Sequence, residues 1–294
     1  MLLAMKPTPS LSDLTRLLAG RAVVALVGAG CSTDSGIPDY RGASAPSPPR
    51  KPMMFKDFRD DSDMHRRYWA RSFVGWPRIA EARPNAAHVA LAHLEAAGSV
   101  VGVISQNVDG LHQAAGTRRL VELHGSLHRV ACLGCGRRTT RADLQDRMAT
   151  ENPLAESGAT DDPVGGRVAP DGDADVDPSA EFHVPCCLAC GGMLKPDVVF
   201  FGENVPRPVV DSAWAAFDRA EVLLVLGSSL TVFSGFRFVR RAAKNGIPVG
   251  ILNLGPTRGD DLATVRVEAP LGHALPHLAR ALPARPHGDR ARHA

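Results

Sequence analysis

A run of six apolar residues, Ala22 to Val27, followed at once by Gly28-Ala29-Gly30, constrains the fold more than any other stretch of this chain. The run is short, unbroken and rich in valine, which is typical of a strand buried on both faces of a sheet. Glycine allows the backbone to turn sharply and a ligand to come close to it. In α/β folds, a strand and turn of this kind present backbone N–H groups to a phosphate. The stretch therefore predicts the first strand of a Rossmann-like parallel sheet with helices on both faces.

The turn after this run indicates dinucleotide binding without deciding it. Thr33 stands where the third glycine of a Rossmann fingerprint belongs, and no convincing acidic residue follows on a second strand about 20 positions later. On these glycines alone, a plain buried strand and turn explains the pattern equally well.

Other apolar runs also end in polar or glycine-rich segments. The runs at 100–104, 120–123, 221–226 and 249–252 lead into Gln106 to Asp109, His124-Gly125, Gly227-Ser228-Ser229 and Asn253, respectively. Ligand-binding groups of open α/β sheets lie at the carboxyl ends of strands, so these segments are candidate sites. Asn107 and Asp109 can instead cap a helix, and that simpler interpretation stays open. Helices are predicted over 11–19, 86–97, 209–220, 236–245 and 275–282, and a further apolar run occupies 198–201.

His124 is the candidate general base. A histidine titrates near neutrality and can take a proton from a sugar hydroxyl. A histidine before a glycine can equally be structural, and the chain contains eleven histidines in all.

The cysteines predict a metal site. Cys132-x-x-Cys135 and Cys187-x-x-Cys190 form two C-x-x-C pairs, each followed by a glycine. Four thiolates suit tetrahedral zinc and leave no position open for water, so the predicted role is structural. Without a signal peptide, metal binding is favoured over disulfides. Cys186 gives a C-x-x-x-C spacing to Cys190, so Cys187 fits better and Cys186 is interpreted as a bystander.

The segment that carries the cysteines differs from the rest of the chain. Residues 129–184 show little strand pattern, and 151–181, rich in Asp, Gly and Pro, are predicted to form a mobile acidic loop. With 51 residues between the pairs, the segment holds more than a bare zinc ribbon. We therefore expect a discontinuous Rossmann-like domain and a small domain. The large domain is assigned to 10–50, 80–128 and 192–283, the small one to a helical module at 51–79 and a zinc-binding module at 129–191, and a flexible tail to 284–294.

Composition excludes several classes of protein. A net charge of +3 over 294 residues gives no argument for binding nucleic acid or a membrane surface. No apolar run approaches the about 20 residues needed to span a bilayer, and the N-terminus lacks a secretory signal. We expect a cytoplasmic protein, and a monomer.

Several motifs together resemble a known family. The stretch Gly28-Ala-Gly-x-Ser-x-x-Ser-Gly-Ile-Pro-Asp-Tyr-Arg41 closely resembles the NAD-binding signature of the sirtuins, the NAD-dependent protein deacylases. Gln106-Asn-Val-Asp109, His124-Gly125, the four cysteines, Lys195-Pro-Asp-Val-Val-Phe-Phe-Gly-Glu203, Gly227-Ser-Ser229 and Asn253-Leu-Gly255 also look like sirtuin signatures, in order over residues 23–271. The segments 67–77 and 253–262 look like the class II branch, which includes the mitochondrial sirtuin four and bacterial relatives.

The resemblance implies an activity and a set of site residues. The activity is transfer of an acyl group from a protein lysine to the ADP-ribose of NAD, with release of nicotinamide. His124 would be the general base, with Asn107 also catalytic. Structural zinc would be held by Cys132, Cys135, Cys187 and Cys190. The NAD site would comprise Gly28, Ala29, Gly30, Ser32, Ile37, Pro38, Asp39, Tyr40, Arg41, Gln106, Asn107, Val108, Asp109, His124, Gly227, Ser228, Ser229, Asn253, Leu254, Gly255 and Leu271.

The resemblance also implies how acylated-lysine proteins or peptides would bind. The segment from Val199 through Phe201 and Gly202 to Glu203 would pair with the substrate backbone as an added strand. Tyr68 and Arg71 lie three apart on an expected helix and share a face. In the desuccinylase branch such a pair reads an acidic acyl group, whereas here a structural role is the favoured interpretation.

Two other functions stay open from the sequence. A protein mono-ADP-ribosyltransferase would let a protein side chain attack the same ribose carbon. A zinc-containing NAD or ADP-ribose sensor would bind without turnover, although His124 and Asn107 argue against it.

Overall fold

The protein is described by a computed structural model that covers residues 9–42, 45, 52–153, 169–174 and 181–285. Its main element is a six-stranded sheet in the order β3-β2-β1-β7-β8-β9. Every neighbouring pair is parallel. The strands are β1 (Val23–Val27), β2 (Val100–Ser105), β3 (Leu120–Glu122), β7 (Val222–Leu226), β8 (Val249–Leu252) and β9 (Val265–Val267). The chain builds outward from β1 to one side and then from β7 to the other, so the strand order reverses between β1 and β7.

Strand β1 is buried on both faces, as the sequence predicted. Its five residues are all buried. Val23, Ala25 and Val27 pack into the apolar core on one side, and Val24 and Leu26 pack into the core on the other. Because side chains alternate along a strand, an unbroken apolar run is what a central strand covered on both faces requires.

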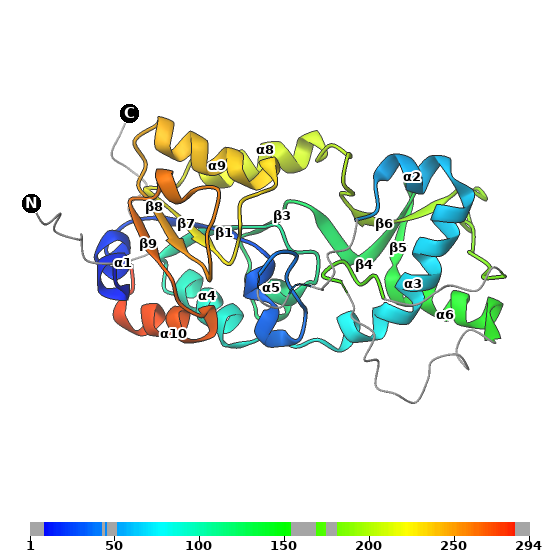
Figure 1. Cartoon of the computed structure of the whole chain (residues 1–294), viewed down its shortest axis with the longest axis horizontal. Helices are drawn as coiled ribbons and strands as arrows, with labels where there is room; N and C mark the ends of the chain where they lie inside the picture. The colour runs from blue at the N-terminus through cyan, green and yellow to red at the C-terminus, as the bar shows by residue number, and fades with distance from the viewer. Residues whose placement is uncertain (1–8, 43–44, 46–51, 154–168, 175–180, 286–294) are drawn as a thin grey trace, which may run out of the picture.

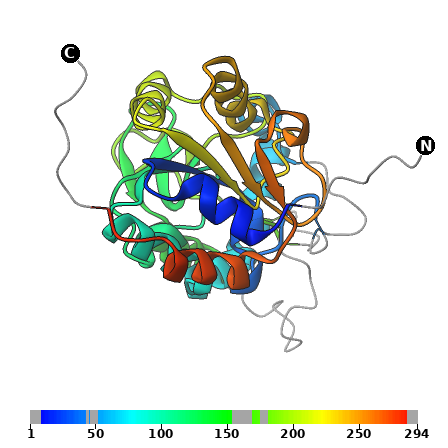
Figure 2. The same ribbon diagram turned by 90° about the vertical axis from the view of Figure 1, so that its left-hand side faces the viewer.

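Helices cover both faces of the sheet (Figure 2). Helices α1 (Leu11–Leu18), α4 (Ala86–Ala96) and α10 (Leu271–Ala281) contribute to the core on one face, and α8 (Arg207–Phe217) and α9 (Phe233–Lys244) to the core on the other. Asn85 caps α4 by accepting hydrogen bonds from the backbone N–H groups of Ala87 and His88. The sheet and its two helical layers confirm the predicted fold class.

A second, smaller sheet lies beside the first (Figure 1). It has the order β5-β4-β6 and is antiparallel throughout. Its strands are β4 (Gly125–Cys132), β5 (Arg138–Thr140) and β6 (Leu194–Val198), and its helices are α2 (Phe55–Asp60), α3 (Ser62–Glu81) and α6 (Arg141–Glu151). Aromatic side chains of α2 and α3, among them Phe58, Tyr68 and Trp69, form its core with Val130 and Leu194.

Several elements differ from the sequence predictions. Residues 129–184 were expected to show little strand pattern, yet β4 extends into this segment and β5 lies within it. All three residues of β5 are exposed, so β5 has no apolar alternation and depends on pairing with β4. The run at 198–201 begins where β6 ends, because β6 is fixed by pairing with β4. Helix α9 begins three residues earlier than predicted, and α10 begins at Leu271 in spite of Pro276 in its interior. Strand β9 and helix α6 were not predicted.

Parts of two predicted flexible segments lie outside the described residues. For the acidic loop these are 154–168 and 175–180, and for the tail 286–294. The described start of the tail is anchored, because the Arg285 backbone N–H donates to the Ala97 carbonyl at 2.7 Å. The described turn at 169–174 is anchored too: Arg71 forms an ion pair with Asp173 at 2.8 Å.

Leu26→Ala tests the central role of β1. Leu26 is fully buried, so the substitution leaves a cavity between the sheet and α8 and α9. We expect the free energy of unfolding to fall by about 2–5 kcal/mol in urea titrations. The control is Leu188→Ala, whose side chain is 81% exposed and whose loss changes stability by less than about 0.5 kcal/mol. Equal effects of the two substitutions would contradict the assignment of β1 to the core.

Candidate active site

The carboxyl ends of the parallel strands open into one large cavity. It has a volume of about 1350 Å³ and lies where the strand order reverses, between the turns that follow β1 and β7. Ligands of open α/β sheets bind at such a reversal, because the connecting chain leaves the sheet in opposite directions there. Residues that follow β1, β2, β3, β7, β8 and β9 all contribute to its lining.

The turns after β1 and β7 touch each other. The backbone N–H of Gly30 donates to the Gly227 carbonyl at 2.9 Å. A Cβ atom on Gly28 would lie 2.7 Å from Cβ of Ser228, and Gly227 has a φ of +58°. Side chains at 28 and 227 are therefore excluded by space and by backbone conformation respectively. The glycines that predicted a ligand-binding turn are required for this contact.

Gln106 connects these strand ends to the candidate base. Its side-chain N–H groups donate to the Val27 carbonyl at 3.2 Å and to Ser228 Oγ at 3.0 Å. Its backbone carbonyl lies 3.0 Å from Nδ1 of His124. A carbonyl can only accept, so Nδ1 carries the proton and the lone pair of neutral His124 is on Nε2. His124 is thus held as the tautomer that a base facing the cavity needs.

Burial is the main influence on the charge of His124. Desolvation of the imidazole lowers its pKa, the hydrogen bond to the Gln106 carbonyl opposes this, and the positive charge of Arg237 lowers the pKa further. The net direction favours a neutral imidazole.

Asn107 and Asp109 belong to a buried polar cluster. Ser32 Oγ donates to Asp109 at 2.6 Å, and the Asn107 side chain donates to Ser32 at 3.1 Å. The other oxygen of Asp109 accepts the backbone N–H of Leu111 at 2.9 Å, at the start of α5 (Leu111–Ala114). Asp109 therefore bonds to the first residue of α5 without being its N-cap, which is Gly110, and it also lines the cavity.

The chain after β6 runs along the same cavity. The backbone N–H of Val199 donates to the carbonyl of His124 at 2.9 Å, which ties this segment to the candidate base. Glu203 accepts the backbone N–H of Phe200 at 2.9 Å and pairs with Lys195 at 3.1 Å. These contacts fix the segment at the edge of the cavity, where it turns at Gly202 with a φ of +80°.

Most of the predicted NAD and substrate residues line the cavity. Four do not: Pro38, Leu271, Tyr68 and Arg71. Leu271 is a buried core residue at the start of α10. Tyr68 is buried among Phe58, Trp69 and Phe200, and the cavity wall near it is formed by Pro170 and Asp171.

Sequence reasoning missed a set of cavity residues at the start of α9. Val232, Phe233, Ser234 and Arg237 all line the cavity, and Ser234 Oγ lies 2.7 Å from Nε2 of His124. The predicted helix began at Phe236, so Ser234 was placed in a loop with no partner. The signal that could have found them is the glycine at 235, which allows a close approach to Gln106.

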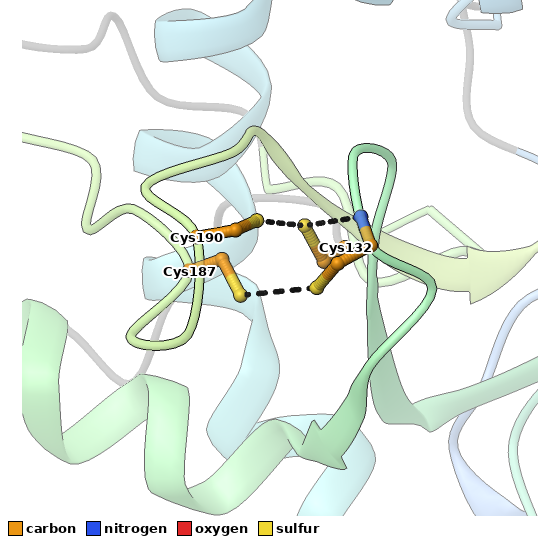
Figure 3. A group of neighbouring side chains, drawn as sticks. Cys132, Cys187 and Cys190 are labelled. Atoms are coloured by element: carbon orange, nitrogen blue, oxygen red, sulfur yellow. Dashed lines mark hydrogen bonds between the residues drawn. The ribbon is translucent and has the colours of Figure 1, made fainter.

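The four C-x-x-C cysteines converge beside the smaller sheet, and Figure 3 labels three of them, Cys132, Cys187 and Cys190. Sγ of Cys132 lies 3.5 Å from Cys190, and Sγ of Cys135 lies 3.8 Å from Cys187. Tetrahedral zinc with Zn–S bonds of about 2.3 Å places its sulfurs about 3.8 Å apart, so the spacing fits zinc. Backbone N–H groups of Gly134 and Cys135 point at Cys132 Sγ, which suits a thiolate. Cys186 is exposed and stands outside the cluster.

A second group of potential ligands contains one buried thiol and two buried imidazoles. Cys31, His88 and His112 are buried within 4.8 Å of one another. The Asn85 backbone N–H donates to Nδ1 of His88 at 3.3 Å, so the proton of neutral His88 is on Nε2, which is buried without a hydrogen-bond partner. Burial lowers the pKa of His112 to about 3, so this imidazole is neutral.

Comparison with known proteins decides the family. The model of the Sir2 family matches residues 28–234, the span that holds the glycine turn, His124 and the four cysteines. The chain belongs to the Sir2 family. The branch within the family stays a prediction.

Curated relatives extend the match of this Sir2 protein over most of the chain. NAD-dependent protein deacetylase 1 of Mycobacterium avium is 53% identical over 91% of this chain and 94% of its own. NAD-dependent protein deacetylase 1 of Streptomyces coelicolor is 50% identical over 92% of this chain and 90% of its own. A solved structure described as Sir2 bound to acetylated peptide has a TM-score of 0.71 at 30% identity and covers 92% of this chain and 98% of that one.

Cys187→Ser and Cys186→Ser form a matched pair that tests the zinc site. We expect metal analysis to give about one zinc per chain for the native protein, and far less for Cys187→Ser, which loses one of four ligands. The Cys187→Ser protein also unfolds at a lower temperature. Cys186→Ser keeps its zinc, because Cys186 is outside the cluster. Zinc loss in Cys186→Ser but not in Cys187→Ser would overturn the assignment.

Proposed function

We propose that this Sir2 protein is an NAD-dependent protein-lysine deacylase that transfers the acyl group to ADP-ribose and releases nicotinamide. The observation that carries the proposal is the tautomer of His124, whose Nε2 faces the cavity between the β1 and β7 turns. Relatives that are 53% and 50% identical to this chain are named NAD-dependent protein deacetylases, which supports the same activity.

The cavity fits NAD in size and in chemistry. The glycine turns after β1 and β7 bring backbone close together, and such turns can approach a pyrophosphate without obstruction by side chains. In this proposal Ala29, Gly30, Tyr40 and Arg41 line the NAD pocket, and Ser228, Asn253 and the Leu271 backbone serve its phosphate and adenosine side. Asn107 and Asp109 serve its nicotinamide end, and Gln106 its ribose.

NAD supplies the ribose carbon that accepts the acyl oxygen, and nicotinamide as the leaving group. His124 acts after nicotinamide leaves, when Nε2 takes a proton from a ribose hydroxyl. Because Nδ1 donates to the Gln106 carbonyl, the imidazole keeps its orientation as it becomes charged. A general base of this kind typically contributes about 10²–10⁴-fold to the rate.

Acylated-lysine proteins or peptides are the proposed substrates. Support comes from the structural neighbour described as bound to an acetylated peptide, and from a second described as bound to a propionylated peptide. The segment Val199 to Glu203 is proposed to pair with the substrate backbone, which gives affinity with little sequence selectivity. Protein mono-ADP-ribosylation is not favoured, because the relatives are named deacetylases.

Some finer expectations remain proposals from the sequence: the class II branch, the two-domain division with the zinc module in the small domain, a cytoplasmic location, a monomeric state and the lack of nucleic-acid binding. The net charge of +3 supports the last of these. Within the described ranges, every helix is too short or too polar to traverse a bilayer.

His124→Ala tests the catalytic assignment. We expect the rate of deacylation of an acetyl-lysine peptide with NAD to fall at least about 100-fold. The reaction is followed by mass spectrometry. Folding and zinc content stay unchanged, because the substitution shortens one side chain at a cavity. His273→Ala, at an exposed position on α10, is the matched control and keeps full activity. A fully active His124→Ala protein would refute the role of His124.

The pH dependence of the reaction follows from the same imidazole. Because burial lowers the pKa of His124 from its ordinary value of 6.5, the neutral base persists at lower pH. We expect the acid limb of kcat/KM to have its midpoint below pH 6.5. A midpoint above that value, in a protein that otherwise deacylates, would show that His124 is not held neutral as described.

A further inference from the structure

Ser234 makes a direct hydrogen bond to the candidate base. Its Oγ lies 2.7 Å from Nε2 of His124, on the cavity side of the imidazole. Since Nδ1 of His124 donates to the Gln106 carbonyl, Nε2 of the neutral ring can only accept. The Ser234 hydroxyl is therefore the donor.

The position of Ser234 is fixed by three contacts of helix α9. A Cβ atom on Gly235 would lie 2.3 Å from Oε1 of Gln106, so the glycine lets the first turn of α9 approach the β2 end closely. The Arg237 Nε–H donates to the Ser234 backbone carbonyl at 3.0 Å. The Arg237 guanidinium in turn lies over the rings of Trp214 and Phe238 at 5.7 and 5.3 Å. These contacts leave the hydroxyl of Ser234 aimed at His124.

The neutral imidazole has a single lone pair at Nε2. While Ser234 donates to this lone pair, a sugar hydroxyl cannot. When the sugar binds, its hydroxyl must therefore replace Ser234 as the donor to Nε2. A serine hydroxyl rotates freely about its C–O bond and can donate elsewhere. A sugar oxygen within hydrogen-bond reach of Nε2 would offer Ser234 a new acceptor, because Ser234 Oγ lies 2.7 Å from the same nitrogen.

We propose that Ser234 is a positioning residue that holds the Nε2 lone pair of His124 toward the cavity and then donates its own hydrogen bond to the sugar oxygen as His124 removes the proton. In this step the O–H bond of the sugar breaks and an N–H bond forms at Nε2. The sugar oxygen keeps the electron pair, and Ser234 keeps its proton. A donor aimed at an oxygen where negative charge develops stabilises the transition state. This inference rests on the proposed function.

The first experiment needs no turnover and no NAD. The Ser234 hydroxyl donates to Nε2 of the neutral ring and can rotate to accept from Nε2–H of the charged ring, so its hydrogen bond is detected at the nitrogen of the neutral ring rather than by the pKa of His124. The other groups that face the ring stay in place: the positive Arg237 on α9, the neutral Gln106 carbonyl from β2, and the neutral Val199 N–H at its backbone carbonyl.

At the alkaline plateau of an NMR titration, where His124 is neutral, we expect the ¹⁵N signal of Nε2 in Ser234→Ala to move downfield relative to the native protein, because its lone pair no longer accepts a hydrogen bond. Ser234→Thr retains the hydroxyl, so we expect it to keep the native Nε2 signal. Ser212→Ala is the matched control on α8, because Ser212 is exposed, donates to the Pro208 carbonyl and does not line the cavity. The signal is assigned by its absence in His124→Ala. An unchanged Nε2 signal in Ser234→Ala would overturn the proposal.

The second experiment separates the two chemical stages. Exchange of labelled nicotinamide into NAD with an acyl peptide reports the stage before His124 acts, and deacylation reports both stages. For Ser234→Ala we expect deacylation kcat to fall about tenfold or more, nicotinamide exchange to stay within about twofold, and KM for NAD not to rise. An equal loss of exchange and deacylation would overturn the proposal, because it would indicate a structural or NAD-binding role.

Ser234→Cys provides a second variant in case the alanine protein does not fold. Because its S–H group is a weak donor, we expect an Nε2 signal and a deacylation rate between those of the native protein and Ser234→Ala. Values equal to the native ones in both experiments would contradict a role for the hydrogen bond. If the native protein lacked deacylase activity, the proposed function would fail, whereas the NMR titration would still decide whether Ser234 controls His124.

Discussion

The contact between the turn after β1 and the turn after β7 is the constraint on which the site depends. Gly30 donates to Gly227 across it, and the space between them excludes a side chain at residue 28. This contact sets where the two halves of the parallel sheet separate and so where a ligand can enter. Gln106, which follows β2, is attached to both strand ends, because its side chain donates hydrogen bonds to Val27 and to Ser228. Its carbonyl then orients His124, so the state of the base is determined by the packing of the sheet.

The smaller sheet contributes to the same site through β4 and β6. His124 directly precedes β4, and its carbonyl accepts the N–H of Val199, the residue after β6. The far ends of the same strands lead to the cysteine cluster, where Cys132 pairs in register with Leu194. Zinc would hold the ends of β4 and β6 together at one end, and the candidate base and substrate segment lie at the other. A structural metal distant from the cavity can thereby support the geometry of the base.

Sequence patterns predicted the parts of the fold that depend on local periodicity and on glycine. The central strands β1, β2, β7 and β8 were predicted within about one residue, because strands covered on both faces need unbroken apolar runs. Strands β5 and β9 were missed, since three residues at an exposed or edge position carry no such signal. The starts of α9 and α10 were misplaced by the glycine at 235 and the proline at 276. That error concealed Ser234, the hydroxyl nearest the base.

The sequence by itself predicted the parallel sheet, the four candidate zinc ligands and His124 as candidate base, and it carried the resemblance to the family, because motifs of residue type and spacing can be recognised without knowledge of packing. Only the tertiary structure decided which tautomer His124 adopts, which hydroxyl faces it, and that Tyr68 and Arg71 lie outside the cavity lining. These properties depend on groups brought together from distant positions, such as Gln106, His124 and Ser234. No local pattern encodes their separation, because it is set by how closely α9 packs against the end of β2.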